Sequence, residues 1–147
     1  MPRYQTSVRT PWAPQRAFEY MSNLENFDEW DPGTKAATRV VGDAPGLGTA
    51  YDLVVRAAGR DMTLRYETIE FDAPRRLTAQ ADTGTLRSLD IITVETASDG
   101  GSVVTYDATL SLKGIAKLGT PLLALAFGRI GDAAAEGLRK ALEGTKA

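Results

Sequence analysis

The chain has 147 residues, of which 43% are hydrophobic and 24% charged, and 17 basic against 19 acidic residues give a net charge of -2. This composition is that of an ordinary globular protein long enough to bury a core, and the absence of a basic excess argues against a nucleic-acid partner. Neither cysteine nor histidine occurs, so disulfides, thiolate nucleophiles and Cys/His zinc sites are excluded, and we expect no metal and no cofactor.

The first expected element is a strand. Apolar and polar residues alternate over positions 3–9, which predicts a half-buried strand. Pro14 suits the first turn of a helix that follows, with its apolar residues on one face. The Asn- and Asp-rich segment 22–33 then predicts a second short helix or turn.

The middle of the chain shows period-two patterns separated by turn residues, which predicts a run of antiparallel strands. We expect these strands at residues 34–42, 49–57, 60–72, 77–83, 85–97 and 104–112. In the third of them the inward phase changes after Tyr66, so a β-bulge is expected near residues 67–68.

The last part of the chain, residues 115–143, is rich in helix formers and predicts one long amphipathic helix ending near Gly144. Pro121 either begins this helix or kinks it. An antiparallel sheet that is apolar on one face needs a cover, and this helix is long enough to supply it. No linker or repeat is visible, so we expect a single domain over residues 1–147.

Four segments follow one another before the closing helix, namely SVRTPWAPQRAFEYMSNLENFDEWDPG, GLGTAYDL, FDAPRRL and GGSVVTYDATLSLKG. Together with that helix they resemble the START-like (SRPBCC) superfamily of helix-grip proteins. The chain is most similar to the polyketide cyclase/dehydrase and lipid-transport branch. The resemblance implies an α+β helix-grip fold, with a curved antiparallel sheet of about seven strands around one long C-terminal helix and two short helices after the first strand. It also implies an apolar cavity, in which members bind lipids, sterols, polyketides or plant hormones, while a minority are enzymes.

The stretch LGTPLLALAFG, residues 118–128, carries no charge. It is far shorter than the roughly 18 to 20 residues that cross a bilayer, so we expect no transmembrane segment. The polar N-terminus lacks the apolar part of a signal peptide, which favours a cytoplasmic location. On a helix the stretch is apolar nearly all the way round, and three interpretations remain open: ordinary core, a wall of the cavity, or the contact of a homodimer.

Inward-facing positions of the strands and the long helix would line the cavity that the resemblance implies. The expected ligand-binding residues are Trp30, Tyr51, Leu53, Val55, Met62, Leu64, Tyr66, Tyr106, Ala108, Leu110, Leu122, Ala126 and Ile130. Core packing is the alternative for each. The three tyrosines are candidates for orienting a ligand, because a buried phenol needs a hydrogen-bond partner and a ligand oxygen can be that partner.

Asp90 is the candidate catalytic residue. Strict alternation over residues 86–97 turns Asp90 inward with Ser88, unless a bulge turns Leu89 and Ile91 inward instead. A carboxylate facing an apolar cavity is expected to have a raised pKa or a cationic partner. Such a group suits a general base or a ligand anchor.

These features favour the binding, transport or sequestration of a small hydrophobic or amphipathic ligand such as a lipid, isoprenoid or polyketide. One alternative is an enzyme similar to polyketide aromatase/cyclases or dehydratases, in which Asp90 moves a proton in the same cavity. The absence of histidine disfavours this alternative, because histidine is the side chain that most readily transfers protons near neutral pH. Another alternative is an interaction module that dimerises through the apolar helix.

Overall fold

The computed structural model describes residues 2–57 and 59–147, except for the side chains of residues 57, 115 and 122–125. Its elements are β1 (Arg3–Thr10), α1 (Pro14–Ser22), η1 (Leu24–Asn26), α2 (Phe27–Trp30), β2 (Thr34–Val41), β3 (Ala50–Ala57), β4 (Arg60–Asp72), β5 (Arg76–Asp82), β6 (Leu86–Thr96), β7 (Ser102–Leu112), η2 (Gly114–Gly119), α3 (Thr120–Ala141) and β8 (Thr145–Lys146). Strands and helices follow one another in the order expected from the sequence.

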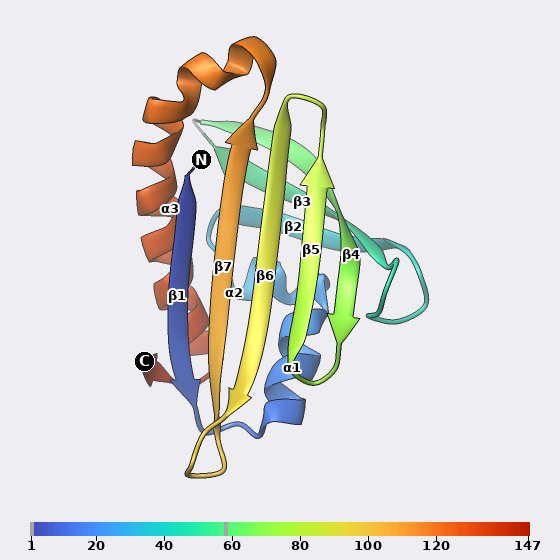
Figure 1. The fold of residues 1–147 in the computed structure, drawn as a ribbon, viewed down its shortest axis with the longest axis vertical. Helices are drawn as coiled ribbons and strands as arrows, with labels where there is room; N and C mark the ends of the chain where they lie inside the picture. Colours follow the sequence, from blue (N-terminus) through green and yellow to red (C-terminus); the bar gives the residue numbers. More distant parts are fainter. Residues whose placement is uncertain (1, 58) are drawn as a thin grey trace.

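Within the described residues the strands form one antiparallel sheet of eight, in the order β2-β3-β4-β5-β6-β7-β1-β8. Figure 1 shows the sheet curling so that β2 and β3 cross behind β6 and β7, while α3 runs along the side of β1. This is the expected helix-grip arrangement. The strand beyond those expected is the two-residue β8, which pairs with Val8 and Arg9 of β1.

The apolar core fills the end of the fold that α1, η1 and α2 cover. Phe18 of α1 packs edge-on against Phe71 of β4, with ring centroids 5.3 Å apart. Trp30 of α2 packs against Tyr106 of β7, with centroids 5.2 Å apart. Leu138, in the C-terminal half of α3, is fully buried against the same cluster. This end of the space between sheet and helix is therefore closed by side chains.

Glycine stands at two contact points of α3 and lets the helix approach its neighbours closely. A Cβ on Gly137 would collide with the backbone carbonyl of Trp30, and a Cβ on Gly131 would collide with the ring of Tyr4. A residue with a side chain at either position would push α3 away from α2 or from β1. These two glycines therefore help to set how α3 lies over the sheet.

The long α-helix begins later than the sequence pattern indicates. It starts at Thr120 with Pro121 in its first turn, and the preceding segment is the 3-10 helix η2. An α-helix running through Pro121 would lack one N–H donor and would press the proline ring against the carbonyl four residues back. Pro121 therefore begins α3 rather than kinking it. None of the described helices is both long and apolar enough to cross a bilayer.

The change of phase in β4 occurs slightly later than expected. The register with β5 shifts between Thr68 and Glu70, so Ile69 is the extra residue and is 43% exposed. Thr68 is buried and still faces the same side of the sheet as Tyr66. Because threonine is polar, its inward position is invisible to a pattern of hydrophobic residues, and the predicted bulge near residues 67–68 came too early.

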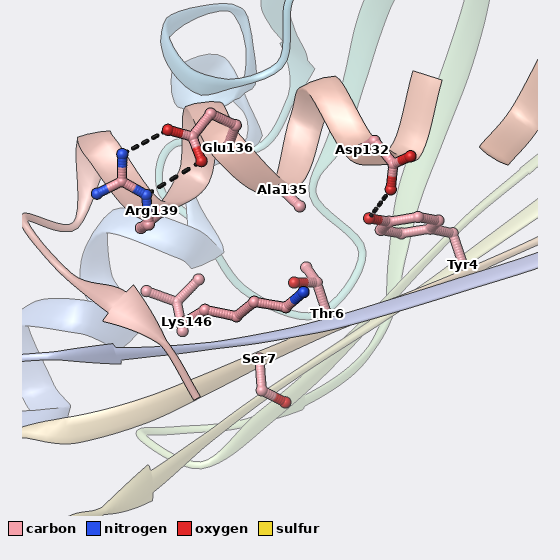
Figure 2. Close-up of a pocket in the computed structure, with 9 residues that line it drawn as sticks. Tyr4, Thr6, Ser7, Asp132, Ala135, Glu136, Arg139 and Lys146 are labelled. Carbon is pink, nitrogen blue, oxygen red and sulfur yellow. Dashed lines mark hydrogen bonds and ion pairs between the residues drawn. The ribbon is translucent and has the colours of Figure 1, made fainter. Parts of the chain in front are cut away.

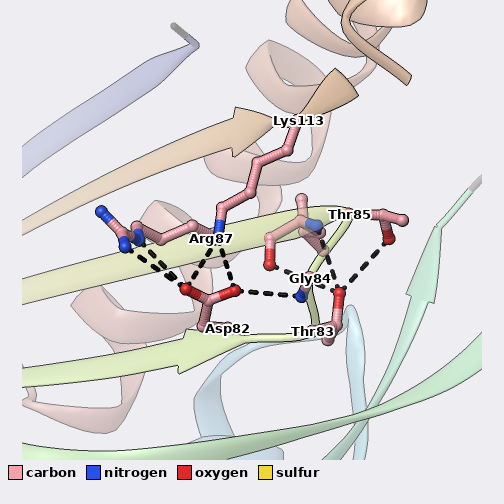
Figure 3. Close-up of polar contacts among 7 residues, drawn as sticks. Asp82, Thr83, Gly84, Thr85, Arg87 and Lys113 are labelled. Carbon is pink, nitrogen blue, oxygen red and sulfur yellow. Dashed lines mark hydrogen bonds and ion pairs between the residues drawn. The ribbon is translucent and has the colours of Figure 1, made fainter. Parts of the chain in front are cut away.

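A cluster of charges fastens the turn between β5 and β6 to the end of β7 (Figure 3). Lys113 donates through Nζ to both carboxylate oxygens of Asp82, at 2.7 and 2.8 Å, and the Gly84 N–H donates to the same carboxylate at 3.0 Å. The guanidinium of Arg87 lies 3.3 Å from Asp82. The hydrogen bonds from Lys113 and Gly84 lower the pKa of Asp82 to about 2.

Candidate functional site

A cavity of about 500 Å³ lies between the inner face of the sheet and α3. Along β4, the exposed fraction of the inward side chains falls from 42% at Met62 to 4% at Leu64 and 6% at Tyr66. The cavity therefore opens beside the turn between β3 and β4 and deepens toward Tyr66. Beyond this deep end lies the packed core under α1 and α2.

Many of the residues expected to bind a ligand surround this cavity. They are Val55 of β3, Met62, Leu64 and Tyr66 of β4, Tyr106, Ala108 and Leu110 of β7 and Ile130 of α3, together with the candidate catalytic residue Asp90 of β6. They meet here because alternate residues of paired strands lie on one face of a sheet, and the curl of the sheet turns that face toward α3.

Other expected residues lie elsewhere. Tyr51, Leu53 and Trp30 are core residues rather than lining residues, each no more than 2% exposed. Ala126 is partly buried but does not line the cavity, and the side chain of Leu122 lies outside the described residues. Alternation identifies the inward face of a strand, but it does not say which part of that face the small helices cover.

The uncharged stretch 118–128 contributes to the cavity in part. Phe127 lines it from α3, beside Gly131 and Ala134 of the following turns. Leu118, in contrast, lies in η2 and is 82% exposed. The stretch is therefore not one continuous wall, because the change from η2 to α3 turns its two ends to different surroundings.

Sequence reasoning missed several polar residues of the lining. Alternation turns Ser88 inward with Asp90, yet Ser88 is not among the expected ligand-binding residues, although it lines the cavity. Asp31 comes from the segment after α2, and Arg56 and Arg60 lie near the turn that joins β3 to β4. No periodic signal marks these three residues, because they stand at the ends of elements.

Asp90 faces the cavity. The pairing of β6 with β7 runs without a register shift, so strict alternation holds along the strand. Ser88 and Asp90 are each 2% exposed and lie on the inner face with Ile92 and Val94. The alternative, in which a bulge turns Leu89 and Ile91 inward, is therefore excluded.

Hydrogen bonds from three hydroxyl groups lead to Asp90 along two branches. The Tyr106 hydroxyl donates to Oδ2 of Asp90 at 2.8 Å. The Tyr66 hydroxyl donates to Oγ of Ser88 at 2.7 Å, and Ser88 donates in turn to Oδ1 of Asp90 across a longer 3.4 Å. Residues from β4, β6 and β7 thus converge on one carboxylate.

Burial is the largest influence on the pKa of Asp90. Burial raises the pKa of Asp90 to about 7, while the hydrogen bond from Tyr106 opposes that rise and the charge of Asp31 adds to it. Burial also raises the pKa of Asp31, against the hydrogen bonds from Gly33 and Thr34. Asp90 can therefore take up or release a proton near neutral pH, and the buried phenols remain protonated because burial holds their pKa values well above 10.

A profile of the family described as polyketide cyclase / dehydrase and lipid transport matches residues 1–143. The chain belongs to this family. No curated protein matches the sequence. The family match spans both the strands that line the cavity and the helix that closes it, in agreement with the resemblance of segments along nearly the whole chain.

Solved structures share the fold of this polyketide cyclase/dehydrase and lipid transport family member. A protein from Thermus thermophilus is 18% identical, with a TM-score of 0.76 and 95% of each chain covered. A START superfamily protein from Mycobacterium smegmatis is 12% identical, with a TM-score of 0.77, covering 96% of this chain and 97% of its own. Ginseng major latex-like protein 151 from Panax ginseng is 9% identical, with a TM-score of 0.67 and coverage of 95% and 96%. At such identities the similarity shows the helix-grip fold alone.

This family member has a second, smaller hollow of about 140 Å³ between β1, β8 and α3 (Figure 2). The Tyr4 hydroxyl donates to Asp132 at 2.8 Å across one side of it, and Arg139 pairs with Glu136 on the other. The first of these bonds joins β1 to α3, whereas Arg139 and Glu136 both belong to α3. Nowhere among the described residues do three acidic side chains gather closely enough to hold a metal ion.

Proposed function

We propose that this protein binds a small hydrophobic or amphipathic ligand, such as a lipid, isoprenoid or polyketide, in the cavity between the sheet and α3. The observation that carries the proposal is the cavity itself, about 500 Å³ in a chain of 147 residues. Protein interiors are close-packed and rarely keep voids larger than a water molecule. A space of this size falls within the range of small-molecule sites.

The lining suits such a ligand. Apolar side chains such as Leu64, Leu110 and Ile130 form the walls, and the buried polar groups gather near Asp90. Burying about 300 Å² of a ligand's apolar surface stabilises the complex by roughly 7 kcal/mol before the costs of association. The exposed Met62 marks the open end, through which a ligand can enter and leave for transport or sequestration.

Native mass spectrometry of gently extracted protein, together with titration of the delipidated protein with an apolar fluorescent dye, tests this function. The variant Ala108→Phe places a ring into the cavity and should abolish dye binding. Thr109→Phe is the matched control, because position 109 lies on the opposite face of β7 and should leave binding unchanged. If no ligand copurifies and the dye does not bind, the proposed function is wrong.

An enzymatic role has one observation in its favour, the buried Asp90 beside the Tyr106 hydroxyl. A carboxyl group with a pKa of about 7 is matched to general acid–base catalysis at neutral pH. In a cyclase or dehydratase reaction Asp90 would remove a proton from a carbon next to a carbonyl group. This role requires that Asp90→Asn abolish turnover of a polyketide substrate while the variant still binds the apolar dye.

A further inference from the structure

If the cavity holds a ligand as proposed above, its deep end decides which polar group that ligand can bury. Four oxygen-bearing side chains converge there from three strands, namely Tyr66, Ser88, Asp90 and Tyr106, and Asp31 joins them from the segment after α2. The remaining walls are largely apolar. The polar group of a ligand that reaches this end must therefore form hydrogen bonds with these oxygens.

The hydroxyl protons at the deep end are already committed within the protein. Tyr66 donates to Ser88, and both Ser88 and Tyr106 donate to Asp90. Each hydroxyl carries a single proton, so none of the three has another to offer. The lone pairs of Asp90 and of the two phenol oxygens remain available, which makes the deep end a hydrogen-bond acceptor.

The same end holds two carboxyl groups without a cation. Asp31 accepts hydrogen bonds from the Gly33 N–H at 2.9 Å and from Thr34 Oγ1 at 3.0 Å. Neither Asp31 nor Asp90 takes part in any ion pair between residues that the structure describes. A buried carboxylate without a cationic partner is costly, and a positively charged ligand group would relieve that cost.

Neither arginine of the lining forms an ion pair with Asp31 or Asp90. Arg56 and Arg60 flank the turn between β3 and β4, and Arg56 lies 3.7 Å from Asp61. Both arginines precede Met62, whose exposure marks the opening. Among the described lining residues, the arginines therefore lie on the side of the opening, and the two carboxyl groups near Tyr66 and Tyr106 have no paired cation.

We propose that the deep end selects ligands whose buried polar group is a hydrogen-bond donor, with a protonated amine preferred over a hydroxyl and a carboxylate rejected. The amine supplies both the donors that Asp90 can accept and the missing positive charge. The hydroxyl supplies a donor alone. A carboxylate would add negative charge beside Asp31 and Asp90 and would meet no free donor, so it is disfavoured by both charge and hydrogen bonding.

Competition between decylamine, decanol and decanoate for the apolar dye tests this selectivity, because the three probes share one chain and differ only in the head group. The titrations use the delipidated full chain at about pH 8, where Asp90 is ionised. We expect decylamine to bind about tenfold more tightly than decanol, and decanoate to bind more weakly than both. Asp90→Asn should reduce the advantage of the amine over the alcohol by about tenfold.

The matched control is Asp107→Asn. It also removes one negative charge, but Asp107 lies on the outer face of β7 in an ion pair with Arg3. Its ranking of the three probes should equal that of the unaltered protein. Thermal unfolding checks that both variants are folded.

A second measurement needs no variant. Lowering the pH from about 8 to about 6 protonates Asp90 and should weaken decylamine binding while leaving decanol binding nearly unchanged. The charged or titratable groups that act on Asp90 are Asp31, Asp107, Tyr66 and Tyr106. Both tyrosines keep their protons in this range, so the change is assigned to the buried carboxyl groups of Asp90 and Asp31.

The outcomes separate this inference from the function on which it rests. If decanoate binds as tightly as decylamine, or if Asp90→Asn leaves the ranking unchanged, the selectivity is refuted while ligand binding stands. If none of the three probes displaces the dye and the dye itself does not bind, both the selectivity and the proposed function are refuted.

Discussion

The Tyr106 hydroxyl lies 2.8 Å from the Asp90 carboxylate and donates a hydrogen bond to it. The two residues are diagonal neighbours on paired strands, because Asp90 is directly opposite Ala108. The ring of Tyr106 also packs against Trp30, so the residue joins the cavity to the core. Changes at this pair should therefore be visible in both the ionisation of Asp90 and the stability of the fold.

The stability of the protein should depend on the ionisation of Asp90. Its pKa in the folded protein, about 7, lies above the ordinary value of 3.8. The folded state thus binds a proton more readily than the unfolded state between these values, and this group's contribution to stability is lost as the pH rises through about 7. The full loss is on the order of 4 kcal/mol.

Asp90→Asn removes this titration. Its free energy of unfolding, measured by urea denaturation, should fall less between about pH 5 and pH 8 than that of the unaltered protein. At the upper end of the range the variant should be the more stable of the two. Parallel curves for the two proteins would show that Asp90 has an ordinary pKa.

Tyr106→Phe should raise the pKa of Asp90 above about 7, because the hydrogen bond from the hydroxyl favours the ionised carboxylate. Carboxyl carbon NMR titration of the labelled protein measures this pKa directly. Tyr20→Phe is the control: the Tyr20 hydroxyl donates to Glu29 at 3.0 Å, away from the cavity. A pKa of Asp90 that is unchanged in Tyr106→Phe would contradict the role of this hydrogen bond.

Gly137→Ala should destabilise the protein by about 1 to 3 kcal/mol, because the added Cβ would collide with the carbonyl of Trp30 and force α3 away from α2. Gly128→Ala is the matched change in the same helix. Outside its own stretch of helix, no described atom lies within 4 Å of a Cβ at that position, so the better helix propensity of alanine should raise stability by about 0.5 to 1 kcal/mol. Thermal unfolding of the two variants should give shifts of opposite sign.

Asp82→Asn should lower stability at neutral pH, because the amide cannot replace the carboxylate that Lys113 and the Gly84 N–H hold. The pKa of Asp82 is depressed from 3.8 to about 2. Its contribution is therefore present above pH 3.8 and is lost as the pH falls through about 2. Unfolding curves of the variant and the unaltered protein should converge in strong acid and at high salt, and a gap of equal size at every pH would contradict this assignment.

The sequence by itself determined the order of the elements and the inward face of the strands. Alternation along β6 placed Asp90 inside with Ser88, and the structure keeps that phase without a bulge. Such patterns succeed because each residue of a strand faces one side or the other whatever packs against it. The start of α3 at Pro121 was open in the sequence, because proline is compatible with both a first turn and a kink.

Tertiary structure alone decided which inward residues meet the cavity. Tyr51 and Tyr66 are direct partners across β3 and β4 and share one face of the sheet, yet only Tyr66 lines the cavity. Tyr51 is buried in the core with Trp30. The difference arises from where α1, η1 and α2 fill the curved sheet, and that depends on contacts between segments far apart in the chain, which no local pattern encodes.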